Sequence, residues 1–214
     1  MKFPRSRILV FARDPEPGTV KTRLVPLLGE QGAASLHARF VHNTLHMACS
    51  AGLSPVELWG SPSVETPFFQ DCAQHYDITL HPQSAGDLGR RMHHAISNAL
   101  ERARSAVLVG ADCPGLCTAD LTGALDALAQ GAGAVVGPAR DGGYFLVGLT
   151  QPNLHLFTGI EWGTSTVFSE TVRRLDDAGI DYHCLAARND VDTPEDYQRL
   201  LTKAARTGQE YRWQ

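Results

Sequence analysis

Short apolar runs rich in β-branched residues alternate along this chain with longer stretches whose apolar residues recur at helical spacing. The short runs predict strands at Ile8–Phe11, Val56–Trp59, Ile78–Leu80, Ala106–Val109, Ala134–Val136, Gly142–Gly148 and Tyr182–Leu185. The intervening stretches predict helices over 30–51, 64–74, 89–102, from 118 onward, 164–178 and 194–205. This alternation is typical of βαβ units around a mostly parallel sheet, which makes the chain an α/β protein.

Length and composition agree with a globular α/β protein. At 214 residues, the chain fits one domain of ordinary size, and we expect a single domain over 1–214. The hydrophobic fraction is 43% and the charged fraction 20%, which excludes a disordered, collagen-like or coiled-coil chain. The chain has 19 basic and 23 acidic residues, so it shows no basic excess that would indicate nucleic-acid binding. A small anionic ligand held by a few local cations remains possible as a partner.

Cysteine usage and apolar stretches predict the compartment. The five cysteines form no CxxC pair, so a zinc site or a disulfide scaffold is not expected. The apolar run Ile8–Ala12 is too short for a signal peptide, and no stretch approaches the roughly 18 residues that span a membrane. We therefore expect a cytoplasmic protein with no membrane partner.

The loop after the first predicted strand carries a glycine and two cations. Gly18 permits close backbone approach, and Lys21 and Arg23 place positive charge beside free amides, which suits a polyphosphate. The spacing is not that of a Walker A loop. A solvated surface turn is the alternative interpretation.

Asp112 directly follows the most apolar predicted strand, Ala106–Val109. In open α/β sheets ligands bind beyond the carboxyl ends of the strands, and Mg²⁺ prefers one or two carboxylates together with substrate phosphates. Asp112 is therefore a candidate metal ligand. The alternative is a cap for the helix near Thr118, although Thr118 is itself closer to that helix.

Two further acidic segments follow predicted strands or precede them. Asp141 stands before Gly142, Gly143 and Tyr144, a pattern that fits either a ligand pressed against the backbone or an ordinary Asp-Gly hairpin turn. The second segment holds Asp190 and Asp192, which lie two positions apart, so their carboxylates share one side of an extended chain. They predict the second half of a magnesium site. The alternative, stabilisation by a helix dipole, accounts for only one of the two.

Other polar residues are weaker candidates. His37, His42 and His46 fall in one predicted helix without the Glu of a metalloprotease motif, so a solvated helix face is favoured over zinc. Cys113 beside Asp112 has no cation tied to it, and we interpret it as a packing residue. At the last helix, Thr193 and Pro194 predict the N-cap and the first helical position.

Five segments occur in an order that resembles a known family: Pro17–Leu24, Gly86–Met92, Gly110–Pro114, Gly137–Tyr144 and Asp190–Asp196. The chain resembles bacterial transferases associated with radical-SAM and selenodomain genes, also described as an arsenosugar-biosynthesis glycosyltransferase family. The resemblance implies the nucleotide-diphospho-sugar transferase (GT-A-like, Rossmann-like) fold, a three-layer α/β/α arrangement with a mainly parallel, mixed sheet. The chain is more distantly similar to molybdenum-cofactor and phospholactate guanylyltransferases.

In those relatives the loop after strand one holds the nucleotide, a carboxylate after the central strand binds Mg²⁺, and a late acidic residue assists. The resemblance therefore implies the following roles: catalysis by Lys21, Arg23 and Asp112; substrate binding by Ala12, Gly18, Thr19, Gly86, Asp87, Asp141, Gly142, Gly143 and Tyr144; metal binding by Asp112, Asp192 and, less directly, Asp190.

The resemblance implies a Mg²⁺- or Mn²⁺-dependent transferase with a nucleotide or nucleotide-sugar donor and a small acceptor. Glycosyl transfer is the first expectation. Sugar-transferring members carry Asp-x-Asp after the central strand, whereas this chain reads Asp112-Cys113-Pro114. This single carboxylate looks more like the nucleotidyltransferase branch. Conversely, Phe11–Pro15 lacks the glycine-rich opening of that branch. Nucleotidyl transfer, a non-catalytic nucleotide-binding protein and a flavodoxin-like fold remain as alternatives.

Overall fold

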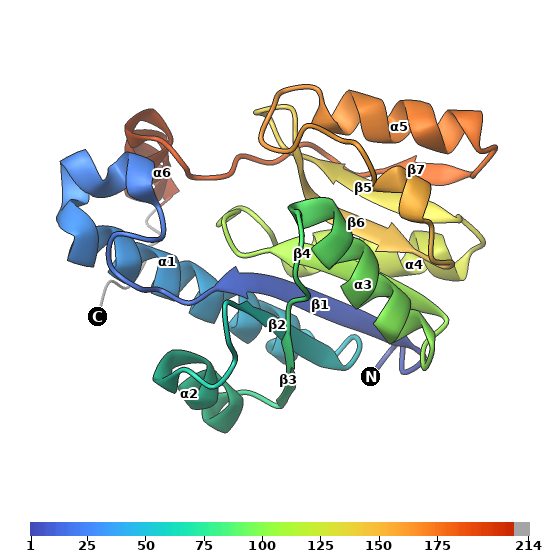
Figure 1. The fold of residues 1–214 in the computed structure, drawn as a ribbon, viewed down its shortest axis with the longest axis horizontal. Coiled ribbons are helices and arrows are strands. Elements are labelled where there is room, and N and C mark those ends of the chain that lie inside the picture. The colour runs from blue at the N-terminus through green and yellow to red at the C-terminus, as the bar shows by residue number, and fades with distance from the viewer. Residues whose placement is uncertain (208–214) are drawn as a thin grey trace.

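The structure is a computed structural model that describes residues 1–207 (Figure 1). Tyr211 and Trp213, whose role the sequence leaves open, lie outside the described residues. Seven strands form one sheet in the order β3-β2-β1-β4-β6-β5-β7. Their bounds are β1 (Ser6–Arg13), β2 (Val56–Ser61), β3 (Ile78–Pro82), β4 (Ser105–Gly110), β5 (Ala134–Pro138), β6 (Tyr144–Leu149) and β7 (Tyr182–Cys184).

Strand β6 runs antiparallel to both of its neighbours, β4 and β5, and every other pair in the sheet is parallel. The predicted α/β fold with a mainly parallel, mixed sheet is thus confirmed. The predicted strand at Gly142–Gly148 begins at Tyr144 because the two glycines form the turn of the β5–β6 hairpin, where Ala139 N–H donates to Gly143 O over 3.0 Å.

Helices connect the strands, and their bounds are η1 (Thr22–Leu24), α1 (Val25–Ser50), α2 (Pro67–His75), α3 (Leu88–Leu100), α4 (Thr118–Ala129), η2 (Leu154–Leu156), α5 (Val167–Asp177) and α6 (Pro194–Thr207). Two details differ from the expectations. Helix α1 begins one turn earlier and is broken at Gly29, whose φ of 70° lies in the left-handed region. The N-cap of α4 is Cys117 rather than Thr118, and Asp120 accepts the Cys117 amide to close a capping box.

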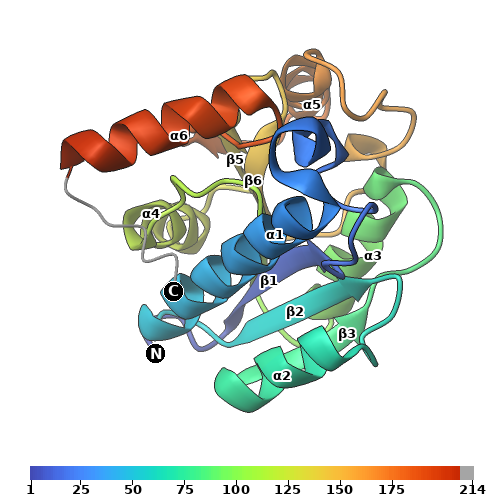
Figure 2. The same ribbon diagram turned by 90° about the vertical axis from the view of Figure 1, so that its left-hand side faces the viewer.

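Alternation along β1 sends side chains to both faces of the sheet. Ile8 and Val10 pack with apolar residues of α1, α2 and α4 on one face, whereas Leu9 and Phe11 pack with those of α3 and α5 on the other. Figures 1 and 2 show these helices covering the two faces, which gives three layers. None of the helices within residues 1–207 combines the length and the apolar character needed to cross a membrane.

Helix α6 belongs to a smaller apolar cluster beside this sandwich. Leu200 of α6 and Val191 before it pack with Leu24, Leu36 and Phe40, which come from η1 and α1. Figure 2 shows α6 lying beside the beginning of α1. This contact joins the end of the described chain to the loop that follows β1.

The sheet topology determines where a ligand can bind. From β1 the chain moves outward through β2 and β3, and then returns to β4 on the other side of β1. The carboxyl ends of β1 and β4 therefore flank a switch point, which is the usual ligand site in open α/β sheets. The loop after β1, Asp112 after β4 and the segment before α6 all lie at this edge.

Candidate functional site

Lys21 lies at the centre of the site. Its side chain is 2% exposed, and its ammonium lies 2.8 Å from Asp112 Oδ1 and 3.6 Å from Asp192 Oδ1. It also donates to the carbonyl oxygen of Val191 over 2.6 Å. One buried cation thus joins three segments that are far apart in the sequence.

The backbone at Lys21 explains how a loop lysine becomes buried. Lys21 has φ 48° and ψ 38°, a left-handed conformation that is uncommon for a residue other than glycine. This turn directs the chain into η1 and brings the ammonium to 5.8 Å from the Phe40 ring centroid. Such a strained residue persists only when its surroundings hold it, and such residues cluster at functional sites.

Asp112 is held from two sides. Its Oδ1 atom is buried between the Lys21 ammonium and Nδ1 of His37, which lies 3.4 Å away, yet the side chain as a whole is half exposed. Burial alone raises the pKa of this carboxyl, but the neighbouring His37 ring and the Lys21 charge outweigh it and hold the pKa well below its usual range. Asp112 is therefore an ionised carboxylate with part of its surface open.

His37 is oriented by the end of β1, since its Nε2 lies 3.0 Å from the carbonyl oxygen of Arg13. The residue is 5% exposed, so the expected solvated helix face is wrong for His37. The pattern carried a signal: Ala33, His37, Phe40 and Val41 recur at helical spacing, which places His37 within the apolar stripe that faces the sheet.

Asp192 is placed by the segment that leads into α6. Asp192 Oδ2 accepts from Arg23 over 2.8 Å, and the neighbouring Val191 amide donates to the Asp112 carbonyl over 3.0 Å. The predicted N-cap Thr193 is confirmed, because its hydroxyl oxygen accepts from the Asp196 amide over 3.3 Å, and the Asp196 carboxylate accepts from the Thr193 amide over 2.8 Å in return. The Asp192 side chain remains 43% exposed, so both carboxylates around Lys21 are open to an incoming ligand.

A cavity of about 390 Å³ opens beside this cluster, and we call it the donor cleft. The predicted site residues that line it are Ala12, Asp112, Asp141, Gly143, Tyr144 and Asp190. The carboxylates of Asp141 and Asp190 interact across it. Burial and the Asp141 charge raise the pKa of Asp190 to about 6. Burial raises the pKa of the Tyr144 hydroxyl as well, so this tyrosine stays neutral.

The remaining predicted residues lie outside the lining of the donor cleft, namely Gly18, Thr19, Lys21, Arg23, Gly86, Asp87, Gly142 and Asp192. Two of them have a local structural role. Asp87 caps α3 by accepting the Arg90 amide over 2.8 Å. A Cβ on Gly142 would lie 2.1 Å from the Ser165 carbonyl oxygen, and its φ is 95°, so only glycine fits this turn. For all eight residues, a role in ligand binding stays a prediction.

Gln83, which sequence reasoning missed, also lines the donor cleft. Its amide nitrogen donates to the carbonyl oxygens of Trp59, over 2.8 Å, and of Ala12, over 3.2 Å. Both amide hydrogens are used, so its amide oxygen remains available as an acceptor for a ligand. These partners lie in two strands, β2 and β1, and no local pattern in the sequence predicts the contacts.

Cys113 fulfils its expected packing role. It is 4% exposed, its thiol lies 3.4 Å from the Asn189 carbonyl oxygen, and burial raises its pKa to about 11. A thiol that is neutral and buried is a poor nucleophile.

The carboxylates of Asp112 and Asp192 fit a divalent metal only if other molecules supply further ligands. No group of three or more His, Cys, Asp or Glu side chains within residues 1–207 is arranged to hold a metal ion by itself. Mg²⁺ usually takes one or two carboxylates and completes its shell with water and substrate phosphates. The half-exposed, ionised Asp112 and the neighbouring Asp192 fit this kind of shared site, in which oxygen atoms of a bound ligand would complete the shell.

Solved structures share this fold. The chain is 32% identical to a protein of Desulfovibrio desulfuricans G20 named "putative nucleotide-diphospho-sugar transferase", with a TM-score of 0.85 over 98% of this chain and 90% of that one. It also resembles a CMP:2-keto-3-deoxy-manno-octonic acid synthetase complexed with CTP, at 13% identity and a TM-score of 0.59 over 95% of this chain and 99% of that one.

A further similarity is to Rv0371c of Mycobacterium tuberculosis H37Rv in complex with manganese, at 18% identity and a TM-score of 0.55 over 94% of this chain and 99% of that one. A search of curated proteins gives no match to this chain.

These likenesses place the chain among proteins with the nucleotide-diphospho-sugar transferase fold, as the motifs predicted. It belongs to the family described as "Uncharacterized protein conserved in bacteria (DUF2064)", whose sequence profile matches residues 44–164. The match spans β4 and Asp112 but begins after Lys21 and ends before Asp190.

Proposed function

We propose that this protein is a Mg²⁺- or Mn²⁺-dependent transferase that moves a group from a nucleotide-activated donor to a small acceptor. One observation carries the proposal: Lys21 draws the half-exposed carboxylates of Asp112 and Asp192 together at the switch point of the sheet, beside a cleft of about 390 Å³. Of the two transfer reactions, glycosyl transfer from a nucleotide-diphospho-sugar is the first candidate. The relative in Desulfovibrio desulfuricans, whose name describes such a transferase, supports this choice.

The donor would lie with its base near the end of β1 and its phosphates toward Asp112. The Gln83 amide oxygen is an acceptor suited to an amino group of a nucleobase, because both amide hydrogens are already bonded. A metal bound with Asp112 and Asp192 would neutralise the donor phosphates and stabilise the leaving group.

Lys21 would act as a positioning residue. Its ammonium is buried and bonded to Val191 and Asp112, so its function would be to hold the two carboxylates at one place and to keep Asp112 ionised. Arg23, with a side chain that is 69% exposed and paired with Asp192, would exchange this partner for a phosphate of the donor. Asp141 and Tyr144 would shape the acceptor end of the cleft.

The second candidate is nucleotidyl transfer, in which a nucleoside triphosphate is joined to a small acceptor and pyrophosphate is released. The single carboxylate in Asp112-Cys113-Pro114 favours it. The fold likeness to a synthetase complexed with CTP is compatible with it. Membership of the radical-SAM- and selenodomain-associated, arsenosugar-biosynthesis-like family stays a prediction of the motif resemblance.

A thermal-shift panel tests the proposal. Nucleoside diphosphates, nucleoside triphosphates and nucleotide-sugars are added with and without Mg²⁺ or Mn²⁺, and a ligand that binds the folded state raises the Tm. We expect stabilisation that requires the metal and is lost in Asp112→Asn. Release of a nucleoside diphosphate identifies glycosyl transfer, and release of pyrophosphate identifies nucleotidyl transfer. A panel in which no nucleotide stabilises the protein would contradict the proposal, and tight binding without turnover over a broad acceptor panel would favour the non-catalytic alternative.

A further inference from the structure

The donor cleft continues into an adjoining cavity of about 200 Å³. Seven residues line both cavities, among them Leu88, Asp141 and Tyr144. Most of the other side chains in the lining of the adjoining cavity are apolar, namely Met92, Leu108, Leu146, Trp162 and Val167. We call this cavity the apolar pocket. Because it shares so much of its wall with the donor cleft, one ligand molecule can occupy parts of both.

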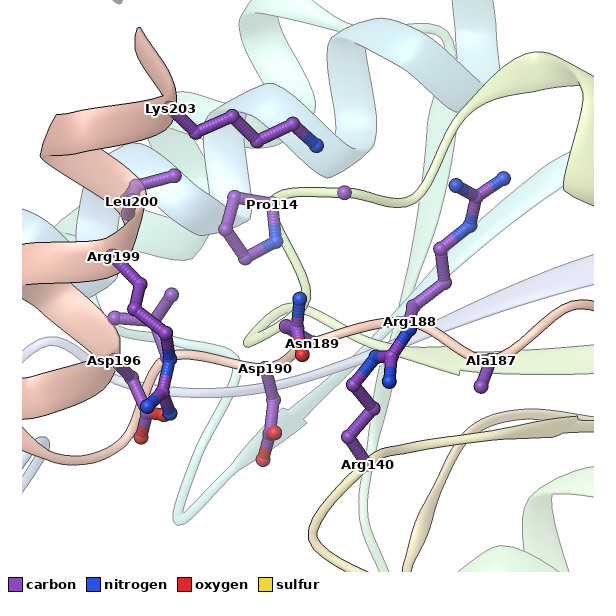
Figure 3. Close-up of a pocket in the computed structure, with 12 residues that line it drawn as sticks. Pro114, Arg140, Ala187, Arg188, Asn189, Asp190, Asp196, Arg199, Leu200 and Lys203 are labelled. Carbon is purple, nitrogen blue, oxygen red and sulfur yellow. The ribbon is translucent and has the colours of Figure 1, made fainter.

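A different cavity, of about 250 Å³, lies between α6 and the segment 187–191 (Figure 3). Among residues 1–207 it shares a single lining residue, Asp190, with the donor cleft. Two of the arginines in its lining are paired with carboxylates, Arg199 with Asp196 and Arg188 with Asp120. The apolar pocket, and not this cavity, is therefore the extension of the donor cleft.

Two glycines allow the outer wall of the apolar pocket to pack closely. This wall includes Trp162, which belongs to the segment that precedes α5. A Cβ on Gly89 would collide with the Phe157 carbonyl oxygen and lie 2.8 Å from the Trp162 ring, so glycine lets this segment pack directly on α3. A Cβ on Gly142 would likewise collide with Ser165 of the same segment. Both glycines belong to the ordered motifs of the sequence, and the apolar pocket gives them a role that the donor cleft does not.

The lining of the apolar pocket selects for an apolar group. Among the described residues Asp141 is the one charged side chain of this lining, and it lies at the junction with the donor cleft. The Thr164 hydroxyl already donates to the Glu161 carbonyl oxygen over 2.8 Å, and the Tyr144 hydroxyl lies 3.9 Å from Met92 Sδ. A polyhydroxylated group would therefore leave hydroxyls unpaired in the pocket, which is costly. Burial of apolar surface there is favourable.

The mouth of the apolar pocket exposes apolar surface to water. Leu88, the first residue of α3, lines both cavities and is 44% exposed. A bound apolar group would cover this side chain. A cavity of about 150 Å³ with an apolar lining binds benzene. The apolar pocket, at about 200 Å³, therefore has room for a single ring or a branched aliphatic group of similar size.

We propose that the acceptor of the transfer is an alcohol with a compact apolar group, which binds in the apolar pocket while the hydroxyl lies at the junction beside Asp141. The inference rests on the proposed function, since it assigns the acceptor class of that same site. In the reaction, the hydroxyl oxygen bonds to the transferred group as the bond from that group to the donor diphosphate or pyrophosphate breaks. The leaving phosphate takes the bonding electrons, and the hydroxyl proton passes to solvent.

Nuclear magnetic resonance of the ¹⁵N-labelled full chain tests the assignment through the indole N–H signal of Trp162, which the Trp162→Phe variant identifies. The probes are benzyl alcohol, as the apolar alcohol, and glycerol, as the polar one. Trp59 is the internal reference, because it is 2% exposed and lines neither cavity. We expect benzyl alcohol to shift the Trp162 signal saturably at millimolar concentration and more than the Trp59 signal, and glycerol to leave both unchanged. A Trp162 signal that does not saturate, or that responds equally to glycerol, would overturn the inference.

Leu88→Ser removes apolar surface from the mouth of the apolar pocket. Leu154→Ser is the matched control, since Leu154 is 49% exposed and lines neither cavity. Both leucines are exposed, so both variants should fold, and their Tm without ligand checks this. We expect the Kd for benzyl alcohol to rise about 5-fold or more in Leu88→Ser, as for the loss of one or two buried methylene groups, and to stay unchanged in Leu154→Ser. Equal affinities in the two variants would contradict the assignment.

Nucleotide binding separates the acceptor from the donor. Benzyl alcohol should still bind in the presence of a saturating nucleoside diphosphate with Mg²⁺, because the two ligands occupy different parts of the joined cavities. Displacement of benzyl alcohol by the nucleotide would assign the apolar pocket to the donor and overturn the inference. With the donor that the thermal-shift panel identifies, benzyl alcohol should accelerate release of the nucleotide product or pyrophosphate more than glycerol does, and an equal or smaller effect would also overturn it.

These outcomes are distinct from a failure of the proposed function. If no nucleotide stabilises the wild-type protein, the transferase proposal fails. The titrations of Leu88→Ser and its control with benzyl alcohol still decide whether the apolar pocket binds an apolar alcohol.

Discussion

Two charge clusters at opposite ends of the same sheet differ in which partner is buried. At the carboxyl end, the buried group is the cation Lys21, and its carboxylate partners, Asp112 and Asp192, remain 50% and 43% exposed. At the amino end, the buried group is the anion Glu57, whose side chain is 4% exposed and lies 2.7 Å from Arg102 and 3.5 Å from Arg7.

Both carboxylate oxygens of Glu57 have partners within the protein. Besides the two arginines, its carboxylate accepts from the Trp59 indole over 3.1 Å. Little of this carboxylate surface is left for a ligand, so the cluster fastens β1 and β2 to the segment before β4. Around Lys21 the geometry is reversed, and open carboxylate surface faces the donor cleft. The comparison teaches that a ligand site is defined by which member of an ion pair is exposed, and not by the ion pair itself.

The largest expected effect separates the two clusters by activity. Asp112→Asn removes the ionised carboxylate that would bind the proposed metal, so metal-dependent turnover should fall by about 10²-fold or more, as for other preorganised electrostatic groups. The measurement is the steady-state rate with the donor that the thermal-shift panel identifies, alongside the Tm of the variant without ligand. Full metal-dependent turnover in Asp112→Asn would refute the assigned role.

Lys21→Met tests whether the buried cation holds the site together. The variant loses the hydrogen bond to Val191 and the ion pairs with two half-exposed carboxylates, so the free energy of unfolding should fall by about 2 kcal/mol, as for hydrogen bonds to charged groups. Nucleotide affinity should fall as well, because Asp112 and Asp192 lose their common partner. Denaturant unfolding measures the first effect. Lys2→Met is the control: Lys2 pairs with Asp126 at the surface, and such pairs contribute about 1 kcal/mol at most. Equal losses in the two variants would contradict the central role of Lys21.

Glu57→Gln is the counterpart at the amino end of the sheet. The amide keeps the shape but not the charge that Arg7 and Arg102 face, so the free energy of unfolding should fall by about 2 kcal/mol. Metal-dependent nucleotide binding should stay unchanged, because the amino end is remote from the donor cleft. A Glu57→Gln protein that unfolds like wild type, or one that loses nucleotide binding, would remove the distinction between the clusters.

The smallest effect concerns the pH dependence of stability at Asp190, where burial and the Asp141 charge raise the pKa to about 6 from an ordinary value of 3.8. The folded protein binds this proton more tightly than the unfolded chain, so the contribution is fully present below the ordinary pKa and is lost as the pH rises through about 6. Asp190→Asn should therefore gain stability relative to wild type at pH 7.5 compared with pH 4. Thermal unfolding at both pH values measures this. An equal difference in Tm at the two pH values would contradict it.

Local sequence signals predicted the elements well where one physical preference dominated. The apolar run Ala106–Val109 became the buried centre of β4, and Thr193 and Pro194 began α6 as expected. In both cases residues close in sequence determine the outcome, through burial of an apolar run or satisfaction of the amides at a helix end.

The site was predictable only in part. A carboxylate after a central strand signals a rim position, which located Asp112, and the spacing of Asp190 and Asp192 signalled a second acidic segment. Gln83 was missed because its partners, Trp59 and Ala12, are brought to it by the sheet. His37 was missed although its helical spacing with the buried residues of α1 signalled burial. Lys21 was predicted as a cation suited to a polyphosphate, and the sequence did not reveal that its ammonium is buried among carboxylates.

The sequence by itself determined the α/β class, the order of the elements and the identity of the acidic segments, since each follows from periodicity, caps and strand ends within a few residues. Only the tertiary structure decided which member of each ion pair is buried and which faces a cavity. It also showed that Asp190 lines two cavities, one of which is the donor cleft. The physical reason is that exposure and desolvation depend on contacts between segments that lie far apart in the chain, and no local pattern encodes those contacts.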